Sequence, residues 1–337
     1  MSPEDKAYES LINGAKKEME EQNYSISEEQ QQKIMKSGKS RAKWTTVVTI
    51  LAILLLVLPV LTLFSFGYYA IGGRANELIE ITDKTIYLTE PNVSVEERDV
   101  ETTMGIFTMK VHLNLEKKIG SDLIRFGNTS IPFLLDKAEQ PVSQYNVDIP
   151  PNNIPYFNDE LIHPKAPLTY YENDEWRKLD GLPEGTVAEA YLSFDKEYSV
   201  KEVKQLFAGK DMELRWYAVY TGNEDIQQAD NGVYVSPIGF PAQIDPDSWS
   251  PFNGEQTNEK AFLDSLKFLQ KHEAVATMVA RSKELDLTKR LKYVEQNGIK
   301  IYGAVVTGPS TEIMKLQDDS FVRGMKRGEV RLWNWES

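Results

Sequence analysis

The stretch TTVVTILAILLLVLPVLTLFSFGYYAI, Thr45 to Ile71, separates two polar parts of this chain. Its 27 residues carry no charge, and 16 of them are Leu, Ile, Val or Phe. As a helix the stretch would be about 40 Å long, enough to cross a hydrocarbon core of about 30 Å with some tilt. A cleaved signal sequence would begin near Met1 and be shorter, and a buried core helix would show polar positions at a helical period. The stretch therefore predicts one transmembrane helix, residues 45–71.

The charges that flank the span predict its orientation. Four cations lie between Lys36 and Lys43 on the N-terminal side, whereas the other side offers Arg74 and then acidic residues. An excess of Lys and Arg marks the cytoplasmic flank of a membrane helix. We therefore expect residues 1–43 in the cytoplasm and residues 74–337 outside the plasma membrane.

The charge and cysteine counts limit what the extracytoplasmic part can do. The chain has 38 basic and 51 acidic residues and a formal net charge of −13. Residues 1–43 hold eight of each sign, so the whole acidic excess follows the span. Such a part does not favour nucleic acid or anionic headgroups as partners. The absence of cysteine excludes disulfides, thiolate catalysis and cysteine-based zinc sites.

Residues 74–180 read as a β-rich, membrane-proximal domain. The segment GIFTMKVHLNLEKK alternates apolar and polar side chains with a period of two, which is typical of a half-buried strand. Its apolar face comprises Phe107, Met109, Val111, Leu113 and Leu115. His112 lies on the polar face, so we expect a solvated histidine rather than a ligand. Six prolines between Asp136 and Pro167 indicate a loop or an inter-domain connection.

Residues 181–337 predict a second domain that contains two strand-helix-strand units. The first unit is TVAEAYLSFD, SVKEVKQLFAG and MELRWYAVYTG, and the second is GIKIYGAVVTG, PSTEIMKLQ and GEVRLWNW. Ser199 caps the first of these helices and Gly209 follows its end. Two helical segments, residues 258–282 and 286–298, separate the units. The fold class is therefore α+β, and the two βαβ units indicate a ferredoxin-like sandwich.

The 43 residues before the span are near the lower limit for a chain that folds on its own. Five apolar residues, which we call the apolar stripe, share one face of a predicted helix: Tyr8, Leu11, Ile12, Ala15 and Met19. Charged residues occupy most of the other side, so this helix has nothing in its own chain to bury against. The apolar stripe predicts a partner-binding surface. The alternative is a frayed tail in which the spacing is accidental.

Residue types that carry chemistry are scarce. The three histidines, His112, His163 and His272, are too far apart to form a local metal motif, and no nucleophile motif accompanies them. The segment TGPST, Thr307 to Thr311, places backbone donors at a helix start, where an anion or simple capping would account for them. We therefore expect no cofactor, no metal site and no enzymatic activity.

Several segments after the span together resemble the sigma-factor regulator family of Gram-positive bacteria. They are GIFTMKVHLNLEKKIG, AEAYLSFDKEYSVKEVKQLF, LRWYAVYTG, YGAVVTGPSTEIMKL and GEVRLWNW. Members of this family are membrane-bound anti-sigma proteins, encoded beside extracytoplasmic-function sigma factors. The resemblance implies that the cytoplasmic part holds such a sigma factor away from RNA polymerase. It also implies that the exported part receives an envelope signal, from a second membrane protein or a cell-wall component.

The N-terminal part departs from many anti-sigma proteins, which have a longer multi-helix domain and often a zinc motif of His and Cys. If the resemblance holds, the apolar stripe would bind the sigma factor by coupled folding, with its acidic flank on a basic surface. A different interpretation is a membrane-anchored envelope binding or scaffold module without sigma binding. An exported enzyme is the least favoured, because no nucleophile and base can be assembled from the sequence.

Overall fold

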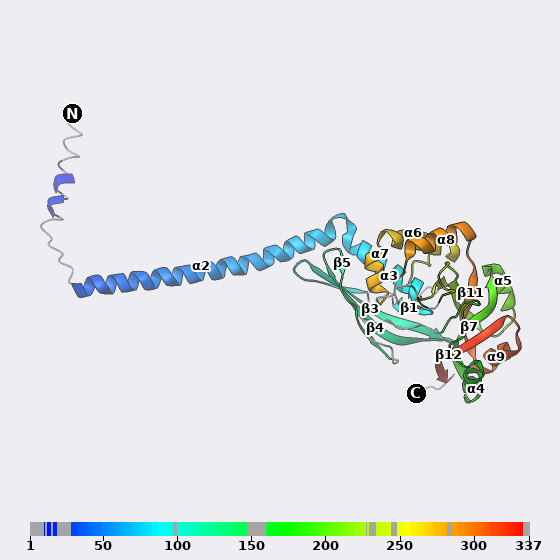
Figure 1. Ribbon diagram of the computed structural model, residues 1–337. Helices are drawn as coiled ribbons and strands as arrows, with labels where there is room; N and C mark the ends of the chain where they lie inside the picture. The colour runs from blue at the N-terminus through cyan, green and yellow to red at the C-terminus, as the bar shows by residue number, and fades with distance from the viewer. Residues whose placement is uncertain are drawn as a thin grey trace. The chain divides into compact units, whose positions relative to one another are not determined.

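The computed structural model describes residues 10, 12–14, 16–18, 28–96, 100–146, 160–226, 228, 234–243, 248–281 and 285–332. The chain comprises two units, Met1–Leu61 and Thr62–Ser337. A long helix dominates the described residues of the first unit, and the second combines helices with two antiparallel sheets (Figure 1). The predicted α+β class is confirmed at this level.

Helix α2, Glu28–Ala70, contains the predicted span. Among the described residues, one helix is long and apolar enough to cross a membrane, and α2 forms its first part. All side chains from Thr45 to Val60 are exposed, so no other part of the protein covers the apolar surface of this stretch. Pro59 lies inside α2 without ending it, as is common in membrane helices.

Two glycines separate α2 from the next helix. Residues Ile71–Gly73 form one 3-10 turn, in which Gly72 and Gly73 have φ angles of 79° and 73°. This left-handed region suits glycine because a Cβ atom would be strained there. Helix α3, Arg74–Thr89, follows directly. The region that reads as β-rich therefore begins with a helix, which the sequence pattern does not mark.

α3 is helical although it contains several β-branched residues. The hydroxyls of Thr82, Thr85 and Thr89 each donate to the carbonyl four residues earlier, at 2.7–2.8 Å, and so are satisfied within the helix. From Ile81 to Thr89 almost every side chain is buried. Because more than one face of α3 is covered, its sequence lacks the single apolar stripe by which a helix is recognised.

The first sheet has the strand order β10-β1-β3-β4-β5, with β2 also paired to β3 and β6 to β4, and all its pairs are antiparallel. Its strands are β1 (Val93–Glu96), β2 (Glu101–Met104), β3 (Thr108–Ile119), β4 (Asp122–Leu134), β5 (Lys137–Ala138), β6 (Val142–Tyr145) and β10 (Ser248–Trp249). The predicted alternation is confirmed from Met109 to Leu115. Phe107, by contrast, lies in the turn before β3.

The second sheet has the order β12-β7-β11-β8-β9, again antiparallel throughout. Its strands are β7 (Thr186–Tyr198), β8 (Glu213–Val219), β9 (Ile238–Pro241), β11 (Ile301–Pro309) and β12 (Val322–Leu332). Both predicted strand-helix-strand units are present, with α5 (Val200–Leu206) in the first and α9 (Ser310–Met314) in the second. Ser199 caps α5 through a capping box with Glu202, as the sequence indicates.

The helices between the two units differ in one respect from the prediction. The first segment forms two helices, α6 (Asn258–Lys271) and α7 (Glu273–Val279), because the backbone leaves helical geometry at His272. The second segment forms α8 (Leu287–Asn297). Helix α4 (Glu172–Asp180) lies before β7 in a region where no helix was expected.

The two predicted extracytoplasmic regions lie in one unit. β10, from the later region, pairs with β1 of the earlier one. α3 packs against α6, α7, β1 and β9, and the main hydrophobic core includes residues of both sheets (Figure 1). The division of this part into domains 74–180 and 181–337 stays a prediction.

Candidate functional site

The apolar stripe falls largely outside the described residues. Ile12 is described, is helical and is 45% exposed. Tyr8, Leu11, Ala15 and Met19 lie outside the described residues. Sigma-factor contact through this stripe therefore stays a prediction.

The end of α2 is hydrogen-bonded to the first sheet of the large unit. Ser65 and Tyr69 are fully buried. The Phe107 N–H donates to the Ser65 hydroxyl at 2.6 Å. The Tyr69 hydroxyl lies 3.1 Å from the Phe107 carbonyl and 3.2 Å from the Leu135 carbonyl. Phe107 lies in the turn between β2 and β3, and Leu135 lies in the turn between β4 and β5. The end of α2 is therefore hydrogen-bonded to both of these turns.

α3 extends this connection to the second sheet. The indole N–H of Trp216 in β8 donates to the Tyr87 carbonyl of α3 at 3.0 Å. The Tyr87 hydroxyl in turn accepts the N–H of Val95 in β1 at 3.2 Å. All three side chains are buried. α3 is therefore fixed to both sheets by directional bonds as well as by packing.

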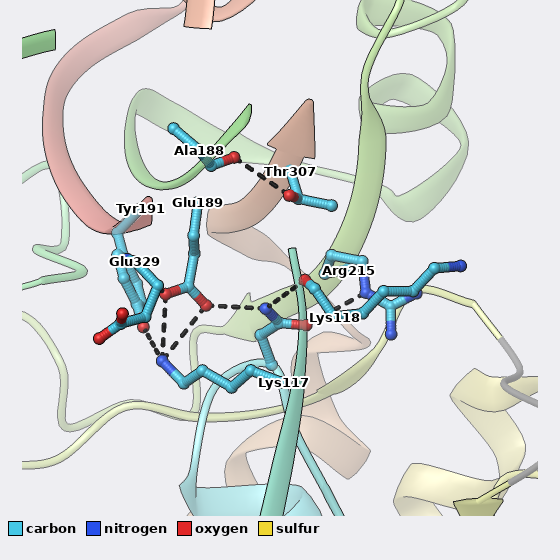
Figure 2. Close-up of polar contacts among 9 residues, drawn as sticks. Lys117, Lys118, Ala188, Glu189, Tyr191, Arg215, Thr307 and Glu329 are labelled. Carbon is cyan, nitrogen blue, oxygen red and sulfur yellow. Dashed lines mark hydrogen bonds and ion pairs between the residues drawn. The ribbon is translucent and has the colours of Figure 1, made fainter. Parts of the chain in front are cut away.

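A buried ion pair joins the two sheets directly (Figure 2). Lys117 lies on the buried face of β3 and Glu189 near the start of β7. The Lys117 Nζ lies 3.1 and 3.3 Å from the two carboxylate oxygens of Glu189 and donates to the Tyr191 hydroxyl at 2.7 Å. The side chain of Glu189 is 0% exposed. A buried ion pair offsets its desolvation cost only when the remaining hydrogen-bond donors and acceptors of both groups also have partners.

Further polar groups complete the bonding of Glu189. The Asn92 amide donates to its Oε1 at 2.7 Å, and the Glu329 N–H donates to its Oε2 at 3.2 Å. Arg215 donates from Nε to the Asn92 Oδ1 at 3.1 Å and pairs with Glu213 at 2.7 Å. These residues extend the network from β3 across the second sheet. Each of the two cations has a carboxylate partner, Lys117 with Glu189 and Arg215 with Glu213, which is the arrangement of a structural network.

The charge states in this network follow from burial and from neighbouring carboxylates. Burial alone lowers the pKa of Lys117, but Glu189 and Glu160 outweigh it, so the pKa is raised and the ammonium stays charged. Burial and the same two carboxylates hold the pKa of Tyr191 well above its usual range. Tyr191 is therefore a neutral phenol that accepts a hydrogen bond from Lys117.

The TGPST segment serves packing between the sheets. The Thr307 hydroxyl accepts the Gly120 N–H at 2.7 Å. It donates to the Ala188 carbonyl at 3.0 Å, as Figure 2 shows. Both bonding directions of the hydroxyl are thus used inside the protein. The β3–β4 turn, which contains Gly120, is held against the second sheet by this bond.

The sequence pattern did not single out Lys117 and Glu189, although it contains a signal for each. Lys117 follows Leu113 and Leu115 at a spacing of two, on the face that is otherwise apolar. Glu189 interrupts the apolar run TVAEAYLSF. A charge at a core position of a strand requires a buried partner, but the pattern cannot say which distant residue supplies it.

The histidines do not form a metal site. In the described part of the chain, no group of three or more His, Cys, Asp or Glu residues could hold a metal ion. His112 lies on the polar face of β3, half-buried, and bonds to the hydroxyls of Ser130 (2.7 Å) and Thr103 (3.2 Å). His272 lies 3.5 Å from the Glu77 carboxylate.

His163 is a buried histidine with a lowered pKa. Its ring stacks on Tyr220 with centroids 4.2 Å apart, and the Lys165 N–H donates to Nδ1, which leaves the hydrogen on Nε2. Nε2 lies 3.4 Å from Glu197 without the alignment of a hydrogen bond. Burial lowers the pKa of His163 to about 4, and the carboxylate of Asp225 offsets only part of that effect.

This pKa predicts a loss of stability on acidification. The unfolded ring titrates near pH 6.5 and the folded ring near pH 4, so the folded state binds fewer protons between these values. The contribution of His163 to the free energy of unfolding is complete above about pH 6.5 and is lost as the pH falls through about 4. Below that pH the loss is about 3 kcal/mol. Urea unfolding at several pH values should show a flatter profile for His163→Phe, which keeps the ring stack, than for the wild type. Parallel profiles would contradict this role.

Comparisons with known proteins give matches over most of the chain. The family model described as Sigma factor regulator N-terminal matches residues 32–124, and the one described as Sigma factor regulator C-terminal matches residues 179–329. The chain is also similar to the probable anti-sigma-M factor YhdL of Bacillus subtilis (strain 168). The two are 33% identical over 332 residues, which cover 97% of this chain and 90% of that relative. No solved structure matches.

Proposed function

Because this chain belongs to the sigma factor regulator family, we propose that it is a membrane-anchored anti-sigma factor for an extracytoplasmic-function sigma factor. The observation that carries the proposal is the similarity to a probable anti-sigma-M factor over 97% of the chain. A protein of this class acts by binding and release rather than by catalysis. The bound sigma factor is held away from RNA polymerase until an envelope signal releases it.

We place the sigma contact on the apolar stripe of the cytoplasmic tail. The described residues between Ser10 and Glu18 are helical, and Ile12 is exposed. A short helix of this kind gains stability when its apolar face enters a groove of a partner. Ordering it on binding costs a few kcal/mol of the interaction energy. The resulting complex is weak enough for a modest signal to release the sigma factor.

The orientation follows from the same proposal. A sigma factor is a cytoplasmic protein, so the tail that holds it lies inside the cell. The excess of cations between Lys36 and Lys43 supports this direction. The unit Thr62–Ser337 then faces the envelope, where a second membrane protein or a cell-wall component would supply the signal.

Signal transfer is proposed to run through the end of α2. A ligand that alters the first sheet displaces the turns around Phe107 and Leu135, which are bonded to Ser65 and Tyr69. These two residues belong to the same continuous helix as the span. A shift or rotation of that helix reaches Glu28, the first residue of α2.

The test is a double substitution in the apolar stripe, Leu11→Asp with Ile12→Asp. An unpaired charge in a buried contact costs several kcal/mol, and a micromolar complex is worth only about 8 kcal/mol. Transcription from the promoters of the cognate sigma factor should therefore rise, while the amount of the variant in the membrane stays at the wild-type level. Such a response also requires the tail to be cytoplasmic.

Substitution of Glu18 and Glu20 by Lys serves as the matched control. In the helix that the sequence predicts, these residues flank the apolar stripe, so their reversal should weaken the complex less and in a salt-dependent manner. Unchanged transcription in the Leu11 and Ile12 variant, at normal protein level, would exclude the apolar stripe as the sigma contact.

We further propose that the second sheet and its helices form a ferredoxin-like arrangement. The order β12-β7-β11-β8 interleaves the strands of the two strand-helix-strand units, with antiparallel neighbours throughout. This interleaving supports the assignment. β9 extends the sheet beyond β8.

A further inference from the structure

The span is longer than a membrane requires. A hydrocarbon core of about 30 Å is crossed by about 20 helical residues, so a crossing that begins at Thr45 ends near Phe64. The remaining uncharged residues, from Ser65 to Ile71, continue toward the large unit. Ser65 and Tyr69 in this part are buried against that unit. In a crossing that begins at Thr45, residues 65–71 lie at the level of the lipid headgroups.

Two hairpin turns of the first sheet meet α2 at this level. The turn between β2 and β3 contains Ile106 and Phe107, and the turn between β4 and β5 begins at Leu135. The Leu135 N–H donates to the Phe107 carbonyl at 3.0 Å, so the two turns are also bonded to each other. We call these two turns, with Leu134 at the end of β4, the hairpin tips.

The hairpin tips expose large apolar side chains. Ile106, Phe107 and Leu134 are 40%, 36% and 46% exposed. Phe107 and Leu135 have φ angles of 54° and 58°, a left-handed conformation that is strained for bulky residues and in which glycine is usual. The turns therefore keep apolar side chains where the backbone alone favours glycine. Exposure of these apolar side chains to water is unfavourable, whereas contact with lipid would be favourable.

We propose that the hairpin tips insert into the membrane surface next to Ser65 and Tyr69, and that their partner is lipid of the leaflet in which α2 ends. The hydrogen bonds to Ser65 and Tyr69 fix their distance from the hydrocarbon core. Ile106, Phe107 and Leu134 then bury apolar area among the headgroups and the upper acyl chains, as the apolar face of an interfacial helix does. The insertion needs no sigma factor and applies to either orientation of the span.

Charged residues limit the depth of insertion. Asp136 and Lys137 are exposed and directly follow Leu135, and a charge within the hydrocarbon core is costly. The tips therefore stop at the headgroup boundary. The acidic net charge of the chain gives no attraction to anionic lipid, so the contact is apolar and should persist at high salt.

A matched pair of leucines on β4 tests the insertion. Leu134 and Leu123 are 46% and 47% exposed, but they lie at opposite ends of the strand, about 36 Å apart at 3.3 Å per residue. The chain has no cysteine, so Leu134→Cys and Leu123→Cys each provide one labelling site. The full-length variants are labelled with an environment-sensitive fluorophore and reconstituted into phosphatidylcholine vesicles.

Emission from position 134 should be strongly quenched by lipids that carry a nitroxide near the headgroup and only weakly by aqueous iodide, with the opposite result at position 123. Ile106→Cys gives an independent measurement on the other tip. Equal iodide quenching at 134 and 123 would place the tips in water and overturn the proposal. Protection of position 134 from both quenchers would mean that protein covers the tips, which also overturns it.

Discussion

Replacement of Glu189 by Ala should lower the free energy of unfolding of the large unit by about 3 to 5 kcal/mol, because it leaves a buried cation without its partner. Burial lowers the pKa of Lys117, and Glu189 and Glu160 are the main groups that raise it. The substitution also removes the acceptor for the Asn92 amide and the Glu329 N–H. Urea denaturation of the full chain, followed by tryptophan fluorescence, measures the change.

Two further variants distinguish the cost of an unpaired buried charge from the cost of losing an ion pair. Glu80→Ala removes the 2.7 Å pair with Lys84 on the exposed side of α3 and should change stability by less than about 1 kcal/mol. Lys117→Met combined with Glu189→Leu removes both buried charges and should recover much of the loss. A Glu189→Ala protein as stable as Glu80→Ala would show that the network contributes little.

The second large effect is expected at Trp216, which is 1% exposed and among the largest fully buried side chains. Trp216→Ala should cost about 3 to 5 kcal/mol, because the cavity cannot collapse fully. The indole packs close to Gly239, where a Cβ atom would lie 2.5 Å from the ring. Thermal unfolding monitored by circular dichroism gives the change as a lower midpoint temperature.

Trp216→Phe divides this effect into packing and hydrogen bonding. Phe keeps most of the buried area but leaves the Tyr87 carbonyl without its donor, at a cost of about 1 to 3 kcal/mol. We expect its midpoint between those of Trp216→Ala and the wild type. If Phe were as damaging as Ala, the bond to α3 rather than the packing of the ring would hold the sheet and α3 together.

The elements that the sequence predicts correctly are those with a local cause. The span follows from an uncharged run, and α5 follows from Ser199 and Glu202, which form a capping box within one turn. The strand around Val111 follows from alternation, because one face of the first sheet is buried and the other is not. Each of these patterns is complete within about a dozen neighbouring residues.

The features that were missed depend on distant residues. α3 is covered on more than one face, so no period marks it as a helix. Lys117 and Glu189 are 72 residues apart, and only the packing of one sheet on the other brings them together. Of the candidate partner-binding residues, the structure describes Ile12, which is exposed; its proposed partner is another protein. No local pattern contains these pairings.

The glycine pair after α2 also determines how the bilayer can act on the protein. A membrane that becomes thinner or thicker changes the tilt of a spanning helix. Because the backbone turns at Gly72 and Gly73, α3 is not a straight extension of α2. A change in the tilt of α2 acts directly on the turn at Phe107, which is hydrogen-bonded to Ser65 and Tyr69. A change in bilayer thickness would thus act first on the first sheet, and α3 and the Lys117–Glu189 pair would carry it on to the second sheet.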